Sequence, residues 1–190
     1  MNGQGEPSGR GRRAALSILL AAAFALTAPG AAAVADARVT PSGLPVPRYV
    51  TLKFGSVNAR SGPGDDYPAL WVYQVRGLPV QVIAESSEWR RICDPDRGVA
   101  WVHMRTTDGR RNVMRTAATP LAVQASPRAD ARTLAVLQPR ALAALQRCES
   151  GWCRIKADGV SGWVQASGLW GVDERPQCAP PRPAPRPAAR

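Results

Sequence analysis

The sequence predicts an all-β protein built from two small tandem barrels, preceded by a signal peptide and followed by a Pro/Arg-rich tail. A repeated pattern carries this prediction: a Trp-x-x-Ile segment begins at Trp89 and again at Trp152, 63 residues later. Each segment is followed by a Trp-Val pair, at Trp101 and at Trp163, which lie 62 residues apart. A period of about 60 residues is too long for most solenoid repeats and suits two small domains.

Residues 1–33 have the layout of a secretory signal peptide. Three arginines between residues 10 and 13 form a basic start, and an almost uninterrupted apolar stretch follows over residues 14–28. This stretch is shorter than the ~20 residues that span a bilayer, and two Ala-x-Ala sites follow it. We expect cleavage after Ala33, with Ala37 as the alternative site, although an uncleaved anchor is a competing interpretation. The protein is therefore expected to be exported, to the periplasm or the cell exterior, without a membrane span after cleavage.

Proline-rich segments flank the predicted barrels. Residues 34–47 form a stiff linker, and residues 175–190 form a tail that lacks core-forming apolar residues and favours a solvated polyproline II conformation. The domains are therefore predicted over residues 48–116 and 117–174. Domains of this size bury a limited core, so additional crosslinks are expected.

The chain is strongly basic. It has 25 Lys and Arg against 14 Asp and Glu, a formal net charge of +11. Such an excess favours anionic polymers. However, export argues against nucleic acid as a partner, and the joint abundance of Ala, Arg, Gly and Pro is typical of a GC-rich genome. The favoured interpretation is a solvated basic surface rather than a dedicated site.

Four cysteines in an exported chain predict disulfides, with three pairings open. Cys148 and Cys153 bracket a Ser-Gly turn between two strand-like segments, and cysteines facing each other across a hairpin reach the required separation. A pair between Cys93 and Cys178, the other two, would tie the start of the tail to the first domain. Zinc binding is disfavoured because there is no Cys-x-x-Cys spacing and the only histidine, His103, is distant.

Short apolar and alternating segments, separated by Gly, Pro, Asp and Ser, predict four strands in each domain. They cover residues 70–75, 80–84, 89–93 and 100–103 in the first, and 132–137, 142–148, 152–156 and 162–164 in the second. Residues 141–145 are rich in Ala and Leu, which favours a helix. The aligned residues 80–84 are rich in β-branched side chains, so a strand is expected in both places.

Residues 57–64, Val-Asn-Ala-Arg-Ser-Gly-Pro-Gly, resemble the Asn-x-Arg-x-Gly-Pro opening of bacterial SH3-like domains. Such domains continue with a Gly before the next strand, then Trp-x-x-Ile and Gly-Trp-Val; Gly77, Trp89 and Trp101 fill these places, although Ala100 replaces the usual Gly. The second copy lacks the Asn-x-Arg-x-Gly-Pro opening, but its Trp-x-x-Ile and Gly-Trp-Val segments match the family pattern closely. The resemblance covers residues 48–172 and implies two tandem SH3-like barrels.

Such modules are associated with the bacterial envelope. The resemblance implies a non-enzymatic binding protein that recognises peptidoglycan or a peptide, so the expected partner is a cell-wall polymer or an envelope protein. A structural or regulatory partner of another envelope protein is the alternative. A cryptic wall hydrolase would have to use His103, and no segment is left for a separate catalytic domain. We expect no enzymatic activity, no cofactor and no metal.

The four tryptophans at repeated positions are interpreted mainly as core packing. They are Trp89, Trp101, Trp152 and Trp163.

Candidate ligand-binding residues lie where the two copies differ. Trp71 and Tyr73 share one face of a predicted strand, and with Arg60 and Tyr67 in the preceding segment they form a groove where a sugar or peptide stacks. The competing interpretation is a lid over a small core. The adjacent acidic pair, residues 65–66, is expected to cap a turn rather than to bind calcium.

Overall fold

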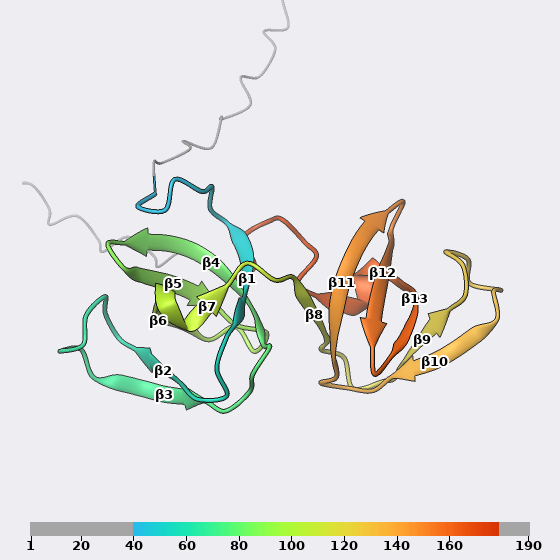
Figure 1. Cartoon of the computed structure of the whole chain (residues 1–190), viewed down its shortest axis with the longest axis horizontal. Helices are drawn as coiled ribbons and strands as arrows, with labels where there is room; N and C mark the ends of the chain where they lie inside the picture. Colours follow the sequence, from blue (N-terminus) through green and yellow to red (C-terminus); the bar gives the residue numbers. More distant parts are fainter. Residues whose placement is uncertain (1–39, 179–190) are drawn as a thin grey trace, which may run out of the picture. The chain divides into compact units, whose positions relative to one another are not determined.

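A computed structural model describes residues 40–178 as two antiparallel sheets of seven strands (Figure 1). Within these residues the only helical turns are two short 3-10 turns. The predicted all-β fold class is therefore confirmed. The predicted signal peptide, the start of the linker and residues 179–190 lie outside the described residues.

The first sheet is formed by seven strands in the order β3-β2-β6-β5-β4-β1-β7. Their bounds are β1 Arg48–Leu52, β2 Val57–Arg60, β3 Ala69–Tyr73, β4 Pro79–Ser86, β5 Trp89–Cys93, β6 Val99–His103 and β7 Thr107–Asp108, with the 3-10 turn η1 at Met104–Thr106.

The second sheet has the same topology, with the order β10-β9-β13-β12-β11-β8-β14. Its strands are β8 Asn112–Arg115, β9 Leu121–Gln124, β10 Thr133–Leu137, β11 Leu142–Glu149, β12 Trp152–Ala157, β13 Val160–Gln165 and β14 Leu169–Trp170, with the 3-10 turn η2 at Ala166–Gly168. We call the two sheets, with their connecting turns, the first and second modules.

All eight predicted strands are present. The Ala- and Leu-rich residues 142–149 form a strand, β11, which pairs with β8 and β12 and is thereby held against its helical propensity. The sequence did not reveal β1, β2, β8 and β9, which have four or five residues each. It also did not reveal β7 and β14, which have only two residues each, too few for alternation to be recognised. The second sheet begins at Asn112, ahead of the expected domain start at residue 117, because β8 pairs with β11.

Two buried clusters are present, the first formed mainly by the first module with Met114 and Trp170 added from the second sheet, and the second formed by the second module. Val80, Val82, Ile92 and Val102 are fully buried in the first cluster, and Ile155 and Val164 in the second.

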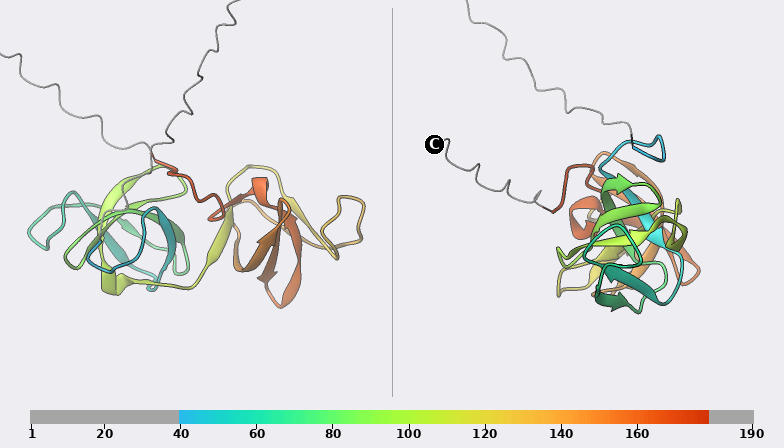
Figure 2. Two further views of the ribbon diagram at one scale, coloured as in Figure 1. Left: turned by 90° about the horizontal axis from the view of Figure 1, so that it is seen from above. Right: turned by 90° about the vertical axis from the view of Figure 1, so that its left-hand side faces the viewer.

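A closing segment, residues 169–178, runs from the last strand back to the first module (Figure 2). Trp170 packs edge-on against Tyr49, and its indole N–H donates to the Pro79 carbonyl at 2.9 Å. The buried amide of Gln81 donates to the Arg175 carbonyl at 2.9 Å and accepts from the Gln177 N–H at 2.8 Å. A buried amide satisfied in this way fixes the path of the closing segment.

Both expected disulfides are present. Cys148 and Cys153 are directly opposite in the β11–β12 hairpin, with 4.0 Å between their Cα atoms. Cys93 at the end of β5 is bonded to Cys178, 85 residues later, so the start of the tail is tied to the first module.

Removing the two disulfides is expected to have unequal effects on stability. The Cys93–Cys178 bond closes an 85-residue loop and the Cys148–Cys153 bond a loop of 5 residues. Chain entropy gives about 4 to 5 kcal/mol for the first and about 2 kcal/mol for the second. Urea denaturation of the two double Cys→Ser variants measures the difference; equal losses would contradict the assignment of the long bond as the stronger crosslink.

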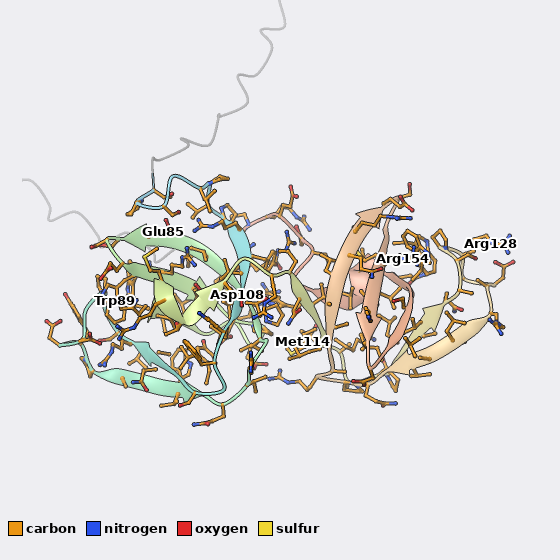
Figure 3. All side chains as sticks on the ribbon, viewed as in Figure 1. Glu85, Trp89, Asp108, Met114, Arg128 and Arg154 are labelled. Carbon is orange, nitrogen blue, oxygen red and sulfur yellow. A yellow bond between two sulfur atoms is a disulfide. The ribbon has the colours of Figure 1, made fainter. Side chains whose placement is uncertain are left out.

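The buried carboxylate of Glu85 is the centre of an ion-pair cluster in the first module. Its side chain is 3% exposed and binds Arg48, the Arg90 Nε at 3.1 Å and the Ser42 N–H at 3.1 Å (Glu85 is labelled in Figure 3). Burial alone raises the pKa of Glu85, but the hydrogen bonds from Ser42 and Arg48 outweigh it and lower the pKa from 4.5 to about 2.

This depressed pKa predicts acid sensitivity. A carboxylate with a lower pKa in the folded state stabilises the fold above its unfolded pKa, and this stabilisation disappears as the pH falls towards 2. The loss attributable to Glu85 is up to about 3 kcal/mol. Unfolding free energies measured between about pH 5 and pH 2 should fall less steeply for Glu85→Gln than for the wild type. Parallel pH profiles would contradict the expectation.

Candidate functional site

The repeated tryptophans of β5 and β12 lie at equivalent positions of two hairpins. In the β5–β6 hairpin Trp89 is opposite His103, and in the β12–β13 hairpin Trp152 is opposite Gln165 (Trp89 is labelled in Figure 3). The rings of Trp89 and His103 are 5.2 Å apart and tilted by 57°. Residues directly opposite on antiparallel strands interact, so each pair forms one wall of a shallow site.

The first site, the Trp89 groove, has a volume of about 180 Å³ and crosses strands β2, β5 and β6. Its lining is polar and charged apart from Val57 and Trp89. The lining residues are Ser56, Val57, Asn58, Arg60, Asp65, Trp89, His103, Arg105 and Thr106.

The second site, the Trp152 groove, has a volume of about 200 Å³ and is lined by aligned positions of the other module. Its lining residues are Leu121, Ala122, Gln124, Ala129, Trp152 and Gln165. Every one aligns with a residue of the Trp89 groove, but none is charged: Gln124 stands where the first module has Arg60, and Ala129 where it has Asp65. The two modules thus share a groove and differ in its charge.

Arg60 and Tyr67, two of the predicted site residues, lie together. The Arg60 guanidinium donates to the Tyr67 carbonyl at 2.7 Å and lies 3.3 Å from the Asp65 carboxylate. The Tyr67 ring covers Gly62, where an added Cβ would be 2.1 Å from the ring. Arg60 therefore lines the Trp89 groove while it fixes the adjoining loop.

Trp71 and Tyr73, the other two predicted residues, lie on the inner face of β3. Their rings pack edge-on at 6.0 Å, and the buried Tyr73 hydroxyl donates to Asp94 at 2.9 Å. Burial, and then the charge of Asp94, raise the pKa of Tyr73 well above its usual range. The four predicted residues therefore form two separate pairs. Arg60 and Tyr67 lie beside the Trp89 groove, and Trp71 and Tyr73 lie against the core.

The core-packing interpretation of the repeated tryptophans is wrong for Trp89, Trp101 and Trp152. These three side chains are partly exposed and belong to neither buried cluster, and Trp163, although buried, lies outside both clusters as well. Their opposite residues are polar, such as Arg91 for Trp101 and Arg154 for Trp163, so these faces of the hairpins point away from the core.

Of the residues that line the Trp89 groove, sequence reasoning predicted Arg60 alone; it missed, among others, Asn58, Trp89, His103 and Arg105. The sequence did contain a signal for the pair Trp89 and His103. If Arg91 and Trp101 are paired in an antiparallel hairpin, counting two residues along each strand places His103 opposite Trp89. His103 is oriented by its neighbours, since its Nδ1 accepts from the Arg105 N–H at 3.2 Å and its Nε2 lies 3.6 Å from Glu88.

A larger hollow of about 670 Å³ lies beside β1. It is built partly from single-copy segments, the loop before β1 and Glu174 of the closing segment. Two of its arginines, Arg48 and Arg90, are already bound to Glu85. We therefore favour the grooves that recur in both modules.

Within residues 40–178 no three His, Cys, Asp or Glu side chains are grouped so as to hold a metal ion. In the same part of the chain no helix is both long and apolar enough to cross a membrane.

A family model described as a bacterial SH3 domain matches residues 53–109 and again residues 117–171. Among solved structures, the chain is similar to NlpC1 and NlpC2 from Trichomonas vaginalis, at 11% identity to each and TM-scores of 0.31 and 0.32. Each alignment covers 65% of this chain, and 45% and 48% of the respective solved chains, so the chain spans less than half of their length. No curated protein sequence matches it.

The hydrogen bond from Tyr73 to Asp94 is expected to stabilise the folded protein. Tyr73→Phe leaves one buried oxygen of Asp94 without its donor, which costs about 1 to 3 kcal/mol of unfolding free energy. The matched variant Leu137→Phe, at the aligned position of β10, removes no hydrogen bond and serves as the control. Chemical denaturation of both variants tests this; an unchanged stability of Tyr73→Phe would contradict it.

Proposed function

Since the chain belongs to the bacterial SH3 domain family, we propose that it is a non-enzymatic binding protein of the cell envelope that recognises peptidoglycan or a peptide. Fold alone does not establish function, so the proposal depends on the chemistry of the site. The observation that carries it is the groove beside the repeated tryptophan, present in both modules and charged in only one.

The Trp89 groove has the groups needed to bind a sugar–peptide polymer. The partly exposed indole of Trp89 offers an apolar face on which a sugar ring or a side chain stacks. The exposed Arg105 provides a guanidinium that binds carboxylates, which wall peptides carry. Asn58 and Asp65 add a donor and acceptors along the same groove. We therefore assign the ligand to the first module.

The disulfides support a location outside the cytoplasm. Such bonds persist in oxidising compartments such as the periplasm or the cell exterior. Both bonds lie in the folded modules, and the predicted signal peptide precedes them. The proposed location is the envelope or its surroundings.

A hydrolytic role receives no support from the cysteines. All four are engaged in disulfides, so a thiolate nucleophile is not available to pair with His103. His103 itself packs at a tilt against Trp89 and lies next to Glu88. We propose that it lines the binding groove.

Co-sedimentation with purified sacculi tests the proposal. The wild-type chain should be retained at physiological salt, and Trp89→Ala should weaken retention by about tenfold or more, as truncation of a central aromatic does at binding sites. Arg105→Glu should weaken it as well, because it reverses the charge offered to wall carboxylates.

Trp152→Ala is the matched control, since it truncates the equivalent side chain of the uncharged groove and should have a smaller effect. If the wild-type chain is not retained by the sacculi, the proposal that it binds peptidoglycan is wrong. If crosslinking then captures an envelope protein through the same groove, the alternative role as a partner of that protein is supported instead.

A further inference from the structure

The second module contains an apolar hollow where the first module is filled. Its volume is about 150 Å³, and its wall is formed mainly by aliphatic side chains. These aliphatic side chains include Val123, Ala135, Leu137, Ile155, Ala157 and Val160.

Strand register shows which residues of the first module occupy this place. In the first module Ala59 pairs with Trp71, and Val57 with Tyr73. In the second, Val123 pairs with Ala135, and Leu121 with Leu137. Ala135 therefore replaces Trp71, and Leu137 replaces Tyr73.

A third replacement enlarges the same space. Asp94 and Ala157 each lie two residues after aligned isoleucines, Ile92 and Ile155. In the first module Asp94 is needed, because its carboxylate accepts from the Asp96 and Gly98 N–H groups and holds the turn after β5.

In the second module the turn after β12 supports itself. Asp158 and Gly159 have φ values of 46° and 82°, the two left-handed residues of a tight hairpin turn. No anchoring carboxylate is required at the position aligned with Asp94, so Ala157 suffices there. The polar side chains in the lining are those of Gln138 and Asp158.

The hollow has an apolar floor and opens to solvent. Leu137 and Ile155 are 4% and 0% exposed, whereas Val136 and Val160 at the rim are 51% and 37% exposed. A benzene-sized molecule fits a volume of ~150 Å³. The hollow is therefore large enough for a single apolar ring or a group of that size.

The first module indicates which group fits. There the aligned space holds the indole of Trp71 packed edge-on against a second ring. The strand beside the hollow, β10, is the last of its sheet and pairs only with β9, so its other edge is open to an extended chain. We propose that this hollow binds an aromatic side chain of an extended partner peptide that pairs with β10.

This site is separate from the Trp152 groove, since the two linings share no residue. It gives the second module a ligand of its own, in addition to the wall or peptide ligand of the first module.

Chemical-shift mapping on the folded chain tests the proposal, with N-acetyl-tryptophan amide as the probe. Saturable shifts are expected at the amides of Ala135, Ile155 and Ala157. Ala135→Trp, which restores the first module's residue, should weaken binding by about tenfold or more because it fills the hollow. If Ala135→Trp does not fold, Ala135→Leu provides partial filling, with a smaller but measurable loss.

Trp152→Ala is the control and should leave these shifts unchanged. The absence of saturable shifts, or equal affinity in the filled variants, would overturn the site. Equal affinity for N-acetyl-leucine amide would overturn the choice of an aromatic ligand. A blocked Val-Trp-Val peptide should bind more tightly than the single residue; equal affinity would overturn pairing with β10. Each result is independent of sacculus binding by the Trp89 groove.

Discussion

The turn after β5 depends on one carboxylate, that of Asp94. It accepts N–H groups from Asp96 at 2.9 Å and Gly98 at 2.7 Å, and the Tyr73 hydroxyl at 2.9 Å. The turn sets the register of the β5–β6 hairpin, and a slip of one residue would move every side chain to the opposite face. The position of Trp89 opposite His103, and hence the groove, follows from this register.

The second module keeps the register without the carboxylate. Its tight Asp158–Gly159 turn holds β12 against β13 through backbone conformation, and Trp152 still lies opposite Gln165. The positions aligned with Asp94, Tyr73 and Trp71 carry Ala157, Leu137 and Ala135. The two modules thus differ in how the hairpin turn is held, in the filling of the adjoining core and in the charge of the groove.

The closing segment joins the chain's last strand to the first module by three different kinds of interaction. Trp170 supplies a buried ring, Gln81 satisfies its amide with the backbone of the segment, and Cys178 adds a covalent bond to Cys93. Small modules bury limited cores, and this combination compensates for that limit.

The sequence by itself determined the two modules, most of their strands and the Cys148–Cys153 bond. These features are local: they follow from alternation within a strand, from turn residues and from a spacing of five residues. It also singled out Arg60, because the Asn-x-Arg-x-Gly-Pro opening differs between the copies, and Arg60 lines the Trp89 groove. Only the tertiary structure decided that Trp89 faces the groove and not the core, that Trp71 and Tyr73 form an inner pair, and that Ala135 leaves a hollow. Those outcomes depend on which strands meet and in what register, and such contacts join residues too distant in sequence for a local pattern to specify them.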